Sequence, residues 1–323
     1  KLMNYKPILI VAGEPNSIFL EIFFKSLKSN RYESPLILIC SKKLLNREMK
    51  KFKINKKIAL IDPKNFFKNE LKKNYINLID VKLNPAFYLK KNLINSQSYI
   101  KRCFDIAFRI IKKKITNKFI NGPISKDKFL NKKFFGMTEY IANEFKVKKN
   151  AMLIYNKDLS VCPITTHLPL KIVAKNIKKK SIIEKIKLIE NFYKKDLKLK
   201  PKIAVLGLNP HCETIDVFNE DKLILKPAIN SLKKLGINVS GPYPADTIFL
   251  KNNRKKFNVI VGMNHDQVLT PLKTLYEYNA INITLGLPFL RISPDHGPNE
   301  KMVGKNMSNP LSLKKALKFL DKS

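Results

Sequence analysis

Short apolar runs alternate with longer helical patterns along this chain, and this alternation restricts the fold more than any other feature. Apolar runs typical of buried strands lie at residues 7–12, 35–40, 159–164, 202–208, 258–261 and 281–285. Segments with apolar residues at helical spacing lie at residues 18–28, 96–113, 170–193 and 222–235. Strands that alternate with helices favour an α/β architecture with a largely parallel sheet. The 323 residues suffice for two such domains of ~150 residues each.

The charge balance is strongly positive. Lys and Arg total 63 against 25 Asp and Glu, which gives a net charge of +38. Proteins that grip nucleic acid rely on Arg, because its planar guanidinium bonds bidentately, but only six of these cations are Arg. Compositional drift toward Lys accounts best for the excess, and an enzyme with anionic substrates is compatible with it. We expect nucleic acid to bind only non-specifically, through charge.

Targeting and redox features of the sequence point to the cytoplasm. No apolar run approaches the ~20 residues of a transmembrane helix. The first 13 residues pass from a short basic stretch straight into a strand-like run, so we expect no signal peptide. No two of the four cysteines have the C-x-x-C spacing of a redox or zinc motif. We therefore expect a cytoplasmic protein with reduced thiols and no membrane segment.

Three of the four histidines share one setting. His167, His211 and His265 each come shortly after an apolar strand-like run. The carboxyl ends of parallel strands meet at one edge of a sheet, where ligands bind, so these side chains can converge on one divalent metal. Imidazole suits Zn, Co or Fe, and three protein ligands leave positions open for a substrate. The alternative is that each histidine is a separate turn residue bonded to a nearby carbonyl.

Other polar residues near these histidines suit a small anion. Lys273 follows His265 at helical distance, Asn282 lies in an apolar run, and Arg291 lies in an apolar segment where an unpaired guanidinium is costly. Asp246 is a candidate base or partner of a metal ligand, with a turn-capping Asp as the equal alternative.

Several nucleotide and hydrolase motifs are missing from the sequence. It contains no G-x-G-x-x-G after the first strand, no P-loop and no G-x-S-x-G elbow. The residues alone therefore indicate a metal-assisted reaction on a small anionic molecule.

Eight segments occur together in a fixed order. They are GEP (13–15), NGPISK (121–126), GMTEY (136–140), TTHLPL (165–170), GLNPH (207–211), GPYPADT (241–247), NHDQ (264–267) and NITLGLPFLRISPDHG (282–297). In order, spacing and total length they resemble the 4-hydroxythreonine-4-phosphate dehydrogenase family of pyridoxal 5′-phosphate biosynthesis. The resemblance runs from near residue 8 to the C-terminus.

This resemblance implies an α/β protein of two α/β/α domains with a cleft between them, related in fold to isocitrate and isopropylmalate dehydrogenases. The first domain would comprise residues 1–128 and 303–323, and the second, residues 129–302, would carry the metal and most substrate residues. The family resemblance also implies a homodimer with the active site at its interface. That fold group binds NAD(P) without the Rossmann fingerprint, which explains why the fingerprint is absent here.

The family's functional residues map onto this sequence one by one. The three metal-binding histidines correspond to His167, His211 and His265, the same three that their position after strands selects. The substrate-binding residues correspond to Thr138, Lys273, Asn282 and Arg291, with Lys273 and Asp246 as catalytic candidates. NAD⁺ and NADP⁺ both remain open, as do Zn, Co, Mg and Mn, the residues that contact the cofactor, and the role of His296.

The reaction that the resemblance implies is the oxidation of 4-phosphooxy-L-threonine by NAD(P)⁺, followed by decarboxylation to 3-amino-2-oxopropyl phosphate. A metal held by neutral imidazoles can lower the pKa of the substrate hydroxyl, and the nicotinamide takes the hydride. Lys273 and Arg291 would hold phosphate or carboxylate by charge-assisted hydrogen bonds.

Three positions depart from the family pattern. Met137 stands where the family has a substrate-contacting His, and Met has no hydrogen to donate to a phosphate oxygen. Residues 212–221 (CETIDVFNED) replace a glycine-rich stretch, and residues 13–21 (GEPNSIFLE) also lack the family's glycines. These departures keep two alternatives open. One is a sibling dehydrogenase for another phosphorylated hydroxy acid, which Met137 favours, and the other is a non-catalytic polyanion-binding protein of the same fold.

Overall fold

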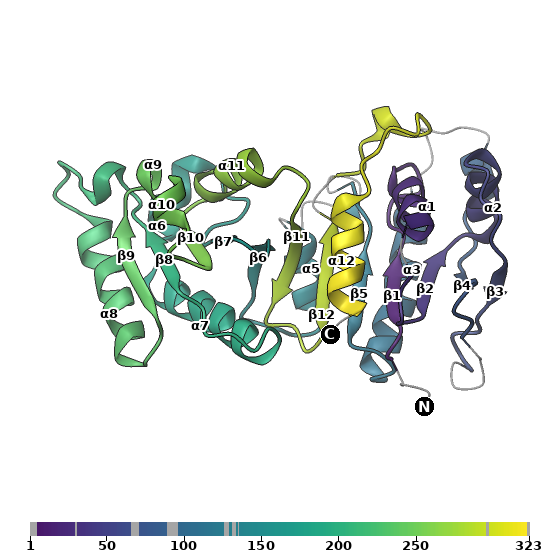
Figure 1. Cartoon of the computed structure of the whole chain (residues 1–323), viewed down its shortest axis with the longest axis horizontal. Coiled ribbons are helices and arrows are strands. Elements are labelled where there is room, and N and C mark those ends of the chain that lie inside the picture. Colours follow the sequence, from purple (N-terminus) through teal and green to yellow (C-terminus); the bar gives the residue numbers. More distant parts are fainter. Residues whose placement is uncertain are drawn as a thin grey trace. The chain divides into compact units, whose positions relative to one another are not determined.

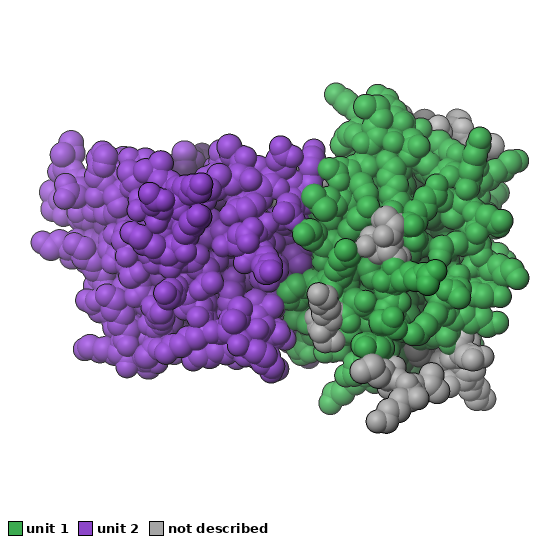
Figure 2. Space-filling view, viewed as in Figure 1, with its two compact units in different colours: residues 1–137, 288–323 green, residues 138–287 purple. Residues whose placement is uncertain are grey.

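The chain forms two compact units. A computed structural model describes residues 5–29, 31–65, 71–88, 96–125, 129–130, 134, 136–294 and 297–321. Unit 1 comprises Lys1–Met137 and Pro288–Ser323, and unit 2 comprises Thr138–Leu287 (Figure 2). Unit 1 is therefore assembled from both ends of the chain, whereas unit 2 is continuous. The domain limits expected from the sequence, 1–128 with 303–323 and 129–302, stay a prediction.

Unit 1 is built on a parallel sheet. Its described strands lie in the order β3(Ile58–Leu60), β4(Ile76–Asp80), β2(Leu36–Cys40), β1(Ile8–Val11), β5(Lys118–Asn121) and β12(Leu290–Pro294). Every neighbouring pair in this order is parallel. A strand covered on both faces is apolar at every position, and β1 is buried along its whole length.

Helices cover both faces of the unit 1 sheet. The C-terminal helix α12(Leu311–Asp321) packs on β12, β1 and α1(Phe19–Ser29), while α3(Gln97–Lys112) packs on β1 and β2 from the other side (Figure 1). α2(Lys42–Lys51) follows β2, and the Ser41 hydroxyl accepts the backbone N–H of Leu44 at its start. The described part of unit 1 also contains the short 3₁₀ turns η2(Pro85–Tyr88) and η6(Glu300–Met302).

Unit 2 has a mixed sheet. β7(Ser160–Pro163), β10(Val259–Gly262), β8(Ile203–Leu206) and β9(Val239–Tyr243) are neighbours in that order and run parallel. β6(Ala151–Tyr155) is antiparallel to β7, and β11(Ile281–Leu285) is antiparallel to β6. The expected parallel sheet is therefore found in unit 1 and in four strands of unit 2, but β6 runs against both of its neighbours, β7 and β11.

The helices of unit 2 follow its strands. The longer ones are α5(Met137–Glu144), α7(Lys179–Lys195), α8(Lys226–Lys234) and α11(His265–Tyr276). The short ones are η3(Leu170–Ile172), α6(Val173–Asn176), η4(Pro210–Cys212), α9(Ala245–Ile248), α10(Lys251–Arg254) and one π-helical turn, η5(Asp221–Leu225). α7 and α8 pack against each other, with α7 also contacting β6 and β11 and α8 contacting β9.

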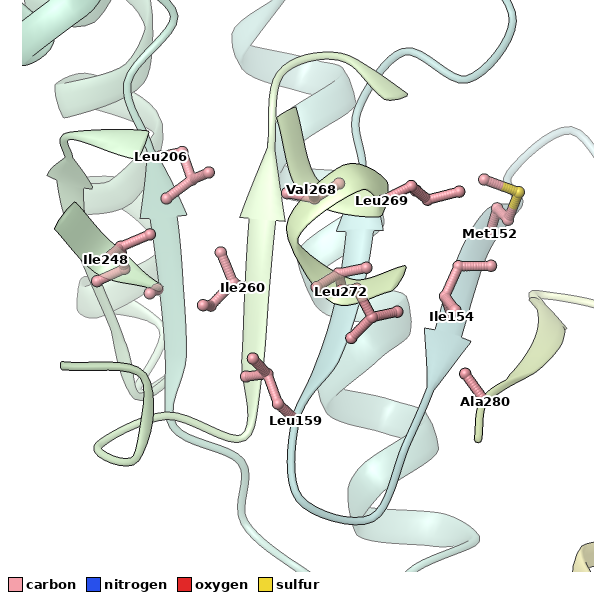
Figure 3. Packing of buried hydrophobic residues seen from close by; sticks show 12 residues of the cluster. Met152, Ile154, Leu159, Leu206, Ile248, Ile260, Val268, Leu269, Leu272 and Ala280 are labelled. Carbon is pink, nitrogen blue, oxygen red and sulfur yellow. The ribbon is translucent and has the colours of Figure 1, made fainter. Parts of the chain in front are cut away.

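An apolar cluster fixes α11 on the unit 2 sheet. The cluster combines Ile260 of β10, Leu206 of β8 and Ile154 of β6 with Val268 and Leu272 of α11, all nearly or fully buried (Figure 3). Burying such side chains contributes about 1.5–3 kcal/mol each. The cluster therefore holds the start of α11, which carries His265, in a defined place next to the strands that precede the other candidate histidines.

The expected elements at 7–12, 18–28, 35–40, 96–113, 159–164, 202–208, 258–261 and 281–285 are confirmed within one or two residues at each end. The helix expected over 170–193 is broken, because Ile177 and Lys178 adopt extended backbone between α6 and α7. Within the described residues no helix combines the length and apolarity needed to cross a membrane. All four cysteines have free thiols.

Candidate functional site

Three neighbouring parallel strands deliver the candidate histidines to one edge of unit 2. His167 follows the end of β7, His211 lies in η4 beyond β8, and His265 is the first residue of α11 after β10. β10 pairs with both β7 and β8. The carboxyl ends of all three strands therefore lie at the same edge, which is where ligands bind in open α/β sheets.

The segments that follow β7 and β10 run side by side. The backbone N–H of Ile164 donates to Gly262 O at 2.7 Å. One residue further, the Thr165 hydroxyl and its backbone N–H both donate to Met263 O, at 2.7 and 3.1 Å. These bonds continue the pairing of the two strands past their ends. They explain why His167 and His265, two residues further along each segment, come to lie together.

His167 and His265 have the spacing of two ligands on one ion. Their ring centres are 5.9 Å apart and their planes are tilted by 38°. Two imidazoles bound to one ion through metal–nitrogen bonds of about 2.1 Å place their ring centres roughly 5–6 Å apart. The pair therefore fits a shared divalent cation as well as a simple ring contact.

A carboxylate orients the His265 ring. His265 Nδ1 lies 2.6 Å from Asp266 Oδ1. An ionised carboxylate only accepts hydrogen bonds, so a neutral His265 ring paired with it has its proton on Nδ1 and its lone pair on Nε2. A carboxylate that fixes the tautomer of a histidine is the usual partner of an imidazole metal ligand. The chemistry of this donor pair is thus suited to a metal, with Nε2 as the ligating atom.

His211 is placed differently. It is exposed and adopts left-handed backbone, with φ 55°, as does Cys212 after it, with φ 62°. Among the described residues no group of three or more His, Cys, Asp or Glu side chains is arranged to hold a metal ion. The structure therefore brings together two of the three candidate ligands, and a three-histidine site stays a prediction.

Gln267 is a residue of this edge that the sequence pattern did not identify. Its Oε1 accepts the backbone N–H of Met263 and its Nε2–H donates to Gly207 O, both at 2.7 Å. It therefore ties the end of β10 to the end of β8. Its neighbour Asn264 caps α11, accepting the Gln267 backbone N–H at 3.0 Å. An amide that bonds only backbone has no sequence signature, apart from its place in the NHDQ segment.

The surroundings of Cys212 favour the protonated thiol over the thiolate. Burial raises the pKa of its thiol, and the negative charge of Asp221 raises it further, against a backbone hydrogen bond from Gly207 that lowers it. Only the thiolate is a nucleophile or a metal ligand. The histidine that precedes it is therefore the chemically relevant group of η4.

The remaining candidates of unit 2 lie on α11, α9, α5 and β11. Lys273 is half-buried on α11, two turns after His265, and Asp246 is exposed in the first turn of α9. The hydroxyls of Thr138 and Thr284 lie 3.4 Å apart, which joins α5 to β11. Within the described chain, Asn282 Oδ1 is a buried acceptor with no hydrogen-bond partner. A buried unsatisfied acceptor calls for an explanation, and a ligand donor is one.

Arg291 belongs to unit 1. It lies in β12, is 2% exposed, and its Nε–H donates to Asn121 Oδ1 at 2.8 Å. Asn121 ends β5 and is the first residue of the NGPISK segment. Met137, at the start of α5, is half-buried. His296, whose role the sequence left open, lies outside the described residues.

Comparisons with known proteins cover nearly the whole chain. The family model described as pyridoxal phosphate biosynthetic protein PdxA matches residues 31–320. A 4-hydroxythreonine-4-phosphate dehydrogenase of Sulfurihydrogenibium sp. (strain YO3AOP1) is 36% identical over 317 residues, 97% of this chain and 96% of that protein. A D-threonate 4-phosphate dehydrogenase of Salmonella typhimurium (strain LT2) is 30% identical over 307 residues, 91% of this chain and 92% of that protein.

The fold is shared with solved structures as well. The crystal structure of 4-hydroxythreonine-4-phosphate dehydrogenase from Klebsiella pneumoniae superposes with a TM-score of 0.82 at 27% identity, covering 98% of each chain. This likeness confirms the α/β fold class expected from the sequence.

Proposed function

The chain belongs to the pyridoxal phosphate biosynthetic protein PdxA family, and we propose that it oxidises 4-phosphooxy-L-threonine with a nicotinamide cofactor. The full-length relationship at 36% identity to a 4-hydroxythreonine-4-phosphate dehydrogenase carries this proposal. The pairing of His167 with His265 at the strand edge supports it from the structure. The product enters pyridoxal 5′-phosphate biosynthesis.

The overall reaction balances as one oxidation and one loss of carbon dioxide. The carbinol carbon gives its hydride to NAD(P)⁺ and the hydroxyl gives up its proton, which leaves a ketone β to the carboxylate. The carboxylate then leaves as CO₂, its bonding electrons pass into the enolate of the ketone, and a proton completes 3-amino-2-oxopropyl phosphate. The protein has to bind two anionic groups, move protons and exclude water.

His167 and His265 are the residues that we propose hold a divalent cation, with His211 as a third ligand. A divalent cation bound there would supply Lewis acidity at the substrate hydroxyl and at the enolate oxygen. Asp266 keeps the His265 proton on Nδ1, so that Nε2 stays available. Imidazole nitrogens, here Nε2 of His265, are ligands that favour Zn or Co over Mg.

The phosphate and carboxylate of the substrate need cationic or donor side chains, and its ammonium group needs an acceptor. Lys273 and Arg291 are the cations that we propose bind phosphate or carboxylate, and Thr138 adds a hydroxyl. Asn282 Oδ1, buried without a partner among the described residues, suits a substrate donor such as the ammonium group or a hydroxyl. Asp246, exposed at the start of α9, is our candidate to take the hydroxyl proton.

A second substrate is favoured by one residue. Met137 replaces a histidine of the family at the start of α5, and the chain is also 30% identical to a D-threonate 4-phosphate dehydrogenase. Losing one hydrogen bond to a phosphate costs roughly 1–3 kcal/mol. D-Threonate 4-phosphate, which has a hydroxyl where the first substrate has an ammonium group, is therefore the alternative substrate.

We also propose that the active enzyme is a cytoplasmic homodimer with its site at the subunit interface, as the family resemblance implies. Sedimentation equilibrium measures the assembly directly. A monomer that turns over substrate at full rate would reject this part of the proposal.

The proposal is tested by mixing the full chain with Co²⁺ or Zn²⁺, NAD⁺ or NADP⁺, and each of the two phosphorylated acids in turn. Reduced nicotinamide is followed by its absorbance, and CO₂ release is measured separately. We expect reduction with 4-phosphooxy-L-threonine that a chelator abolishes and added metal restores. Reduction with D-threonate 4-phosphate alone would select the sibling activity. No reduction with either, together with tight binding of polyanions, would favour the non-catalytic alternative.

A further inference from the structure

The segment that joins β8 to His211 needs an external support. It leaves the sheet at Leu206 and reaches two consecutive left-handed residues, His211 and Cys212. Left-handed backbone at residues other than Gly costs on the order of 1 kcal/mol or more each and persists only where the surroundings impose it. The groups that hold residues 207–209 therefore decide where the His211 side chain is presented.

Asp221 is the main support of this segment. Its side chain is fully buried, at 0% exposure. Oδ1 accepts the backbone N–H of Leu208 at 2.7 Å. Oδ2 accepts both the backbone N–H of Asn209 at 3.1 Å and the Asn209 side-chain amide at 3.0 Å. Hydrogen bonds to a carboxylate are roughly twice as strong as neutral ones, so one side chain fixes two successive peptide groups.

Gly207 lets the carboxylate approach this closely. A Cβ added to Gly207 would lie 2.9 Å from Asp221 Oδ1 and 2.6 Å from Cys212 Sγ. Gly207 is also held on its other sides, because its N–H donates to Tyr243 O at 2.9 Å and its carbonyl accepts from Gln267 at 2.7 Å. The segment is thus fixed by β9 through the Gly207 N–H, by α11 through the Gly207 carbonyl and by Asp221 through the N–H groups of Leu208 and Asn209.

The support itself is anchored. Asp221 begins η5, which continues directly into α8, and α8 packs on β9 and α7 (Figure 1). The neighbouring Glu220 reaches only the side chain of Asn209, with Nδ2 at 3.2 Å from its Oε2. Asp221 therefore bonds both the backbone and the side chain of Asn209, whereas Glu220 bonds only its side chain.

From this geometry we propose that Asp221 is a positioning residue that sets the place of His211 for metal binding. The inference rests on the proposed role of His211 as a ligand. It also gives a role to residues 212–221, which replace a glycine-rich stretch of the family, because this segment ends on the carboxylate that holds Leu208 and Asn209 ahead of His211. A buried Asp that only stabilises the loop is the competing explanation.

A double-mutant cycle separates the two explanations. Co²⁺ affinity of the full chain is measured by the visible absorption of the bound ion in wild type, Asp221→Asn, His211→Ala and the double variant, with Glu220→Gln as the matched control. We expect Asp221→Asn to weaken Co²⁺ binding about 10-fold or more, the usual effect of removing an outer-shell partner. Because Asp221 acts through His211, it should have no further effect in the His211→Ala background.

Each other outcome is decisive. If His211→Ala leaves Co²⁺ affinity unchanged, the ligand assignment of the proposed function fails. If His211→Ala weakens binding but Asp221→Asn does not, or if their effects add, the positioning role is overturned. Glu220→Gln should bind Co²⁺ like wild type, and a loss equal to that of Asp221→Asn would also overturn it.

Hydrogen exchange gives a test that needs no variant. The amides of Leu208 and Asn209 lie beyond the end of β8, where loop amides normally exchange fast. The bonds to Asp221 predict that both are protected to the same degree as the β8 amides. Fast exchange at both positions would overturn the inference even if Asp221→Asn did not fold.

Discussion

Replacing Asn282 with Leu should make the protein more stable and inactive. Asn282 is the second residue of β11, and its register partner across the antiparallel pair is Ile154 of β6. Directly opposed residues of an antiparallel pair share one face, and Ile154 belongs to the apolar cluster beneath α11 (Figure 3). Asn282 Oδ1 is buried on that face and has no hydrogen-bond partner among the described residues.

The size of the effect follows from the unsatisfied acceptor. A buried acceptor without a partner costs about 1–3 kcal/mol. Leu has nearly the shape of Asn and no polar atom, so Asn282→Leu should raise the free energy of unfolding by that amount. In a cooperative unit of about 150 residues, each kcal/mol shifts the melting temperature by roughly 2–4 °C. Activity should fall, because the substrate donor loses its acceptor.

Thr284→Val is the matched control. Thr284 lies two residues along β11 on the same face, is 2% exposed, and its hydroxyl lies 3.4 Å from that of Thr138. Val keeps the shape of Thr but loses the hydrogen bond, so this variant should be less stable by about 0.5–1.5 kcal/mol. Urea unfolding followed by circular dichroism measures both. If Asn282→Leu is destabilised as much as Thr284→Val, Asn282 Oδ1 is satisfied in solution and the reasoning is wrong.

Three further predictions concern activity, pH and thiol chemistry. Met137→His should increase kcat/KM for 4-phosphooxy-L-threonine by roughly 10-fold, because the variant regains a hydrogen bond to the phosphate. Steady-state kinetics measures this change, and no gain would argue that the substrate differs. Lys118 is buried with its Nζ donating to Ser34 Oγ at 3.2 Å, and burial lowers the pKa of its ammonium. The unfolded chain then binds more protons than the folded one, so the free energy of unfolding rises as pH increases from below the lowered folded pKa to the ordinary value near 10.4. Lys118→Met should flatten this rise in urea titrations at pH 7 to 10.5. Burial raises the pKa of all four thiols, and Cys212 alone of them is half-exposed. Mass spectrometry after iodoacetamide treatment should therefore find Cys212 alkylated first, but slowly at pH 7. Rapid labelling of Cys212 at pH 7 would contradict its raised pKa.

The strands that the sequence predicts share one property. β1, β2, β8 and β10 are apolar at nearly every position, since both of their faces are covered. β7 and β11 keep this pattern except at Ser160, Asn282 and Thr284. β9 reads VSGPY and was missed, because Gly and Pro are poor strand residues that an edge strand tolerates. β5 was missed because its four residues begin and end with the polar Lys118 and Asn121, both buried.

The helix boundary at Ile177 shows another limit of periodicity. Apolar residues continue at helical spacing through residues 170–193, and neither Gly nor Pro marks the break after α6. The extended backbone of Ile177 and Lys178 instead lets Ile177 be buried while α7 starts in a new direction. Tertiary packing decides that helix boundary, so the apolar periodicity within the segment does not predict it.

The candidate site was predictable where it depends on strand ends. The rule that parallel strands finish at one edge selected His167 and His265, which the structure places together. Asp221 and Gln267 were not predictable in the same way, because their partners are backbone groups of residues 207–209 and 263. Any polar side chain can form a hydrogen bond with a peptide group, so the pairing becomes visible only once the chain is folded.

The discontinuity of unit 1 imposes an order on its folding during synthesis. β5 pairs with β1 on one side and with β12 on the other, and β12 comes from the second segment of the unit. The Ser34 N–H donates to Asp321 of α12, and the Ser308 N–H donates to Glu21 of α1. Side-chain hydrogen bonds therefore also join the N-terminal and C-terminal segments of unit 1. On the ribosome, every residue of unit 2 is made before β12 and α12 exist. Until they arrive, the β5 edge stays open to pairing with other chains, which makes a nascent or truncated unit 1 prone to aggregation.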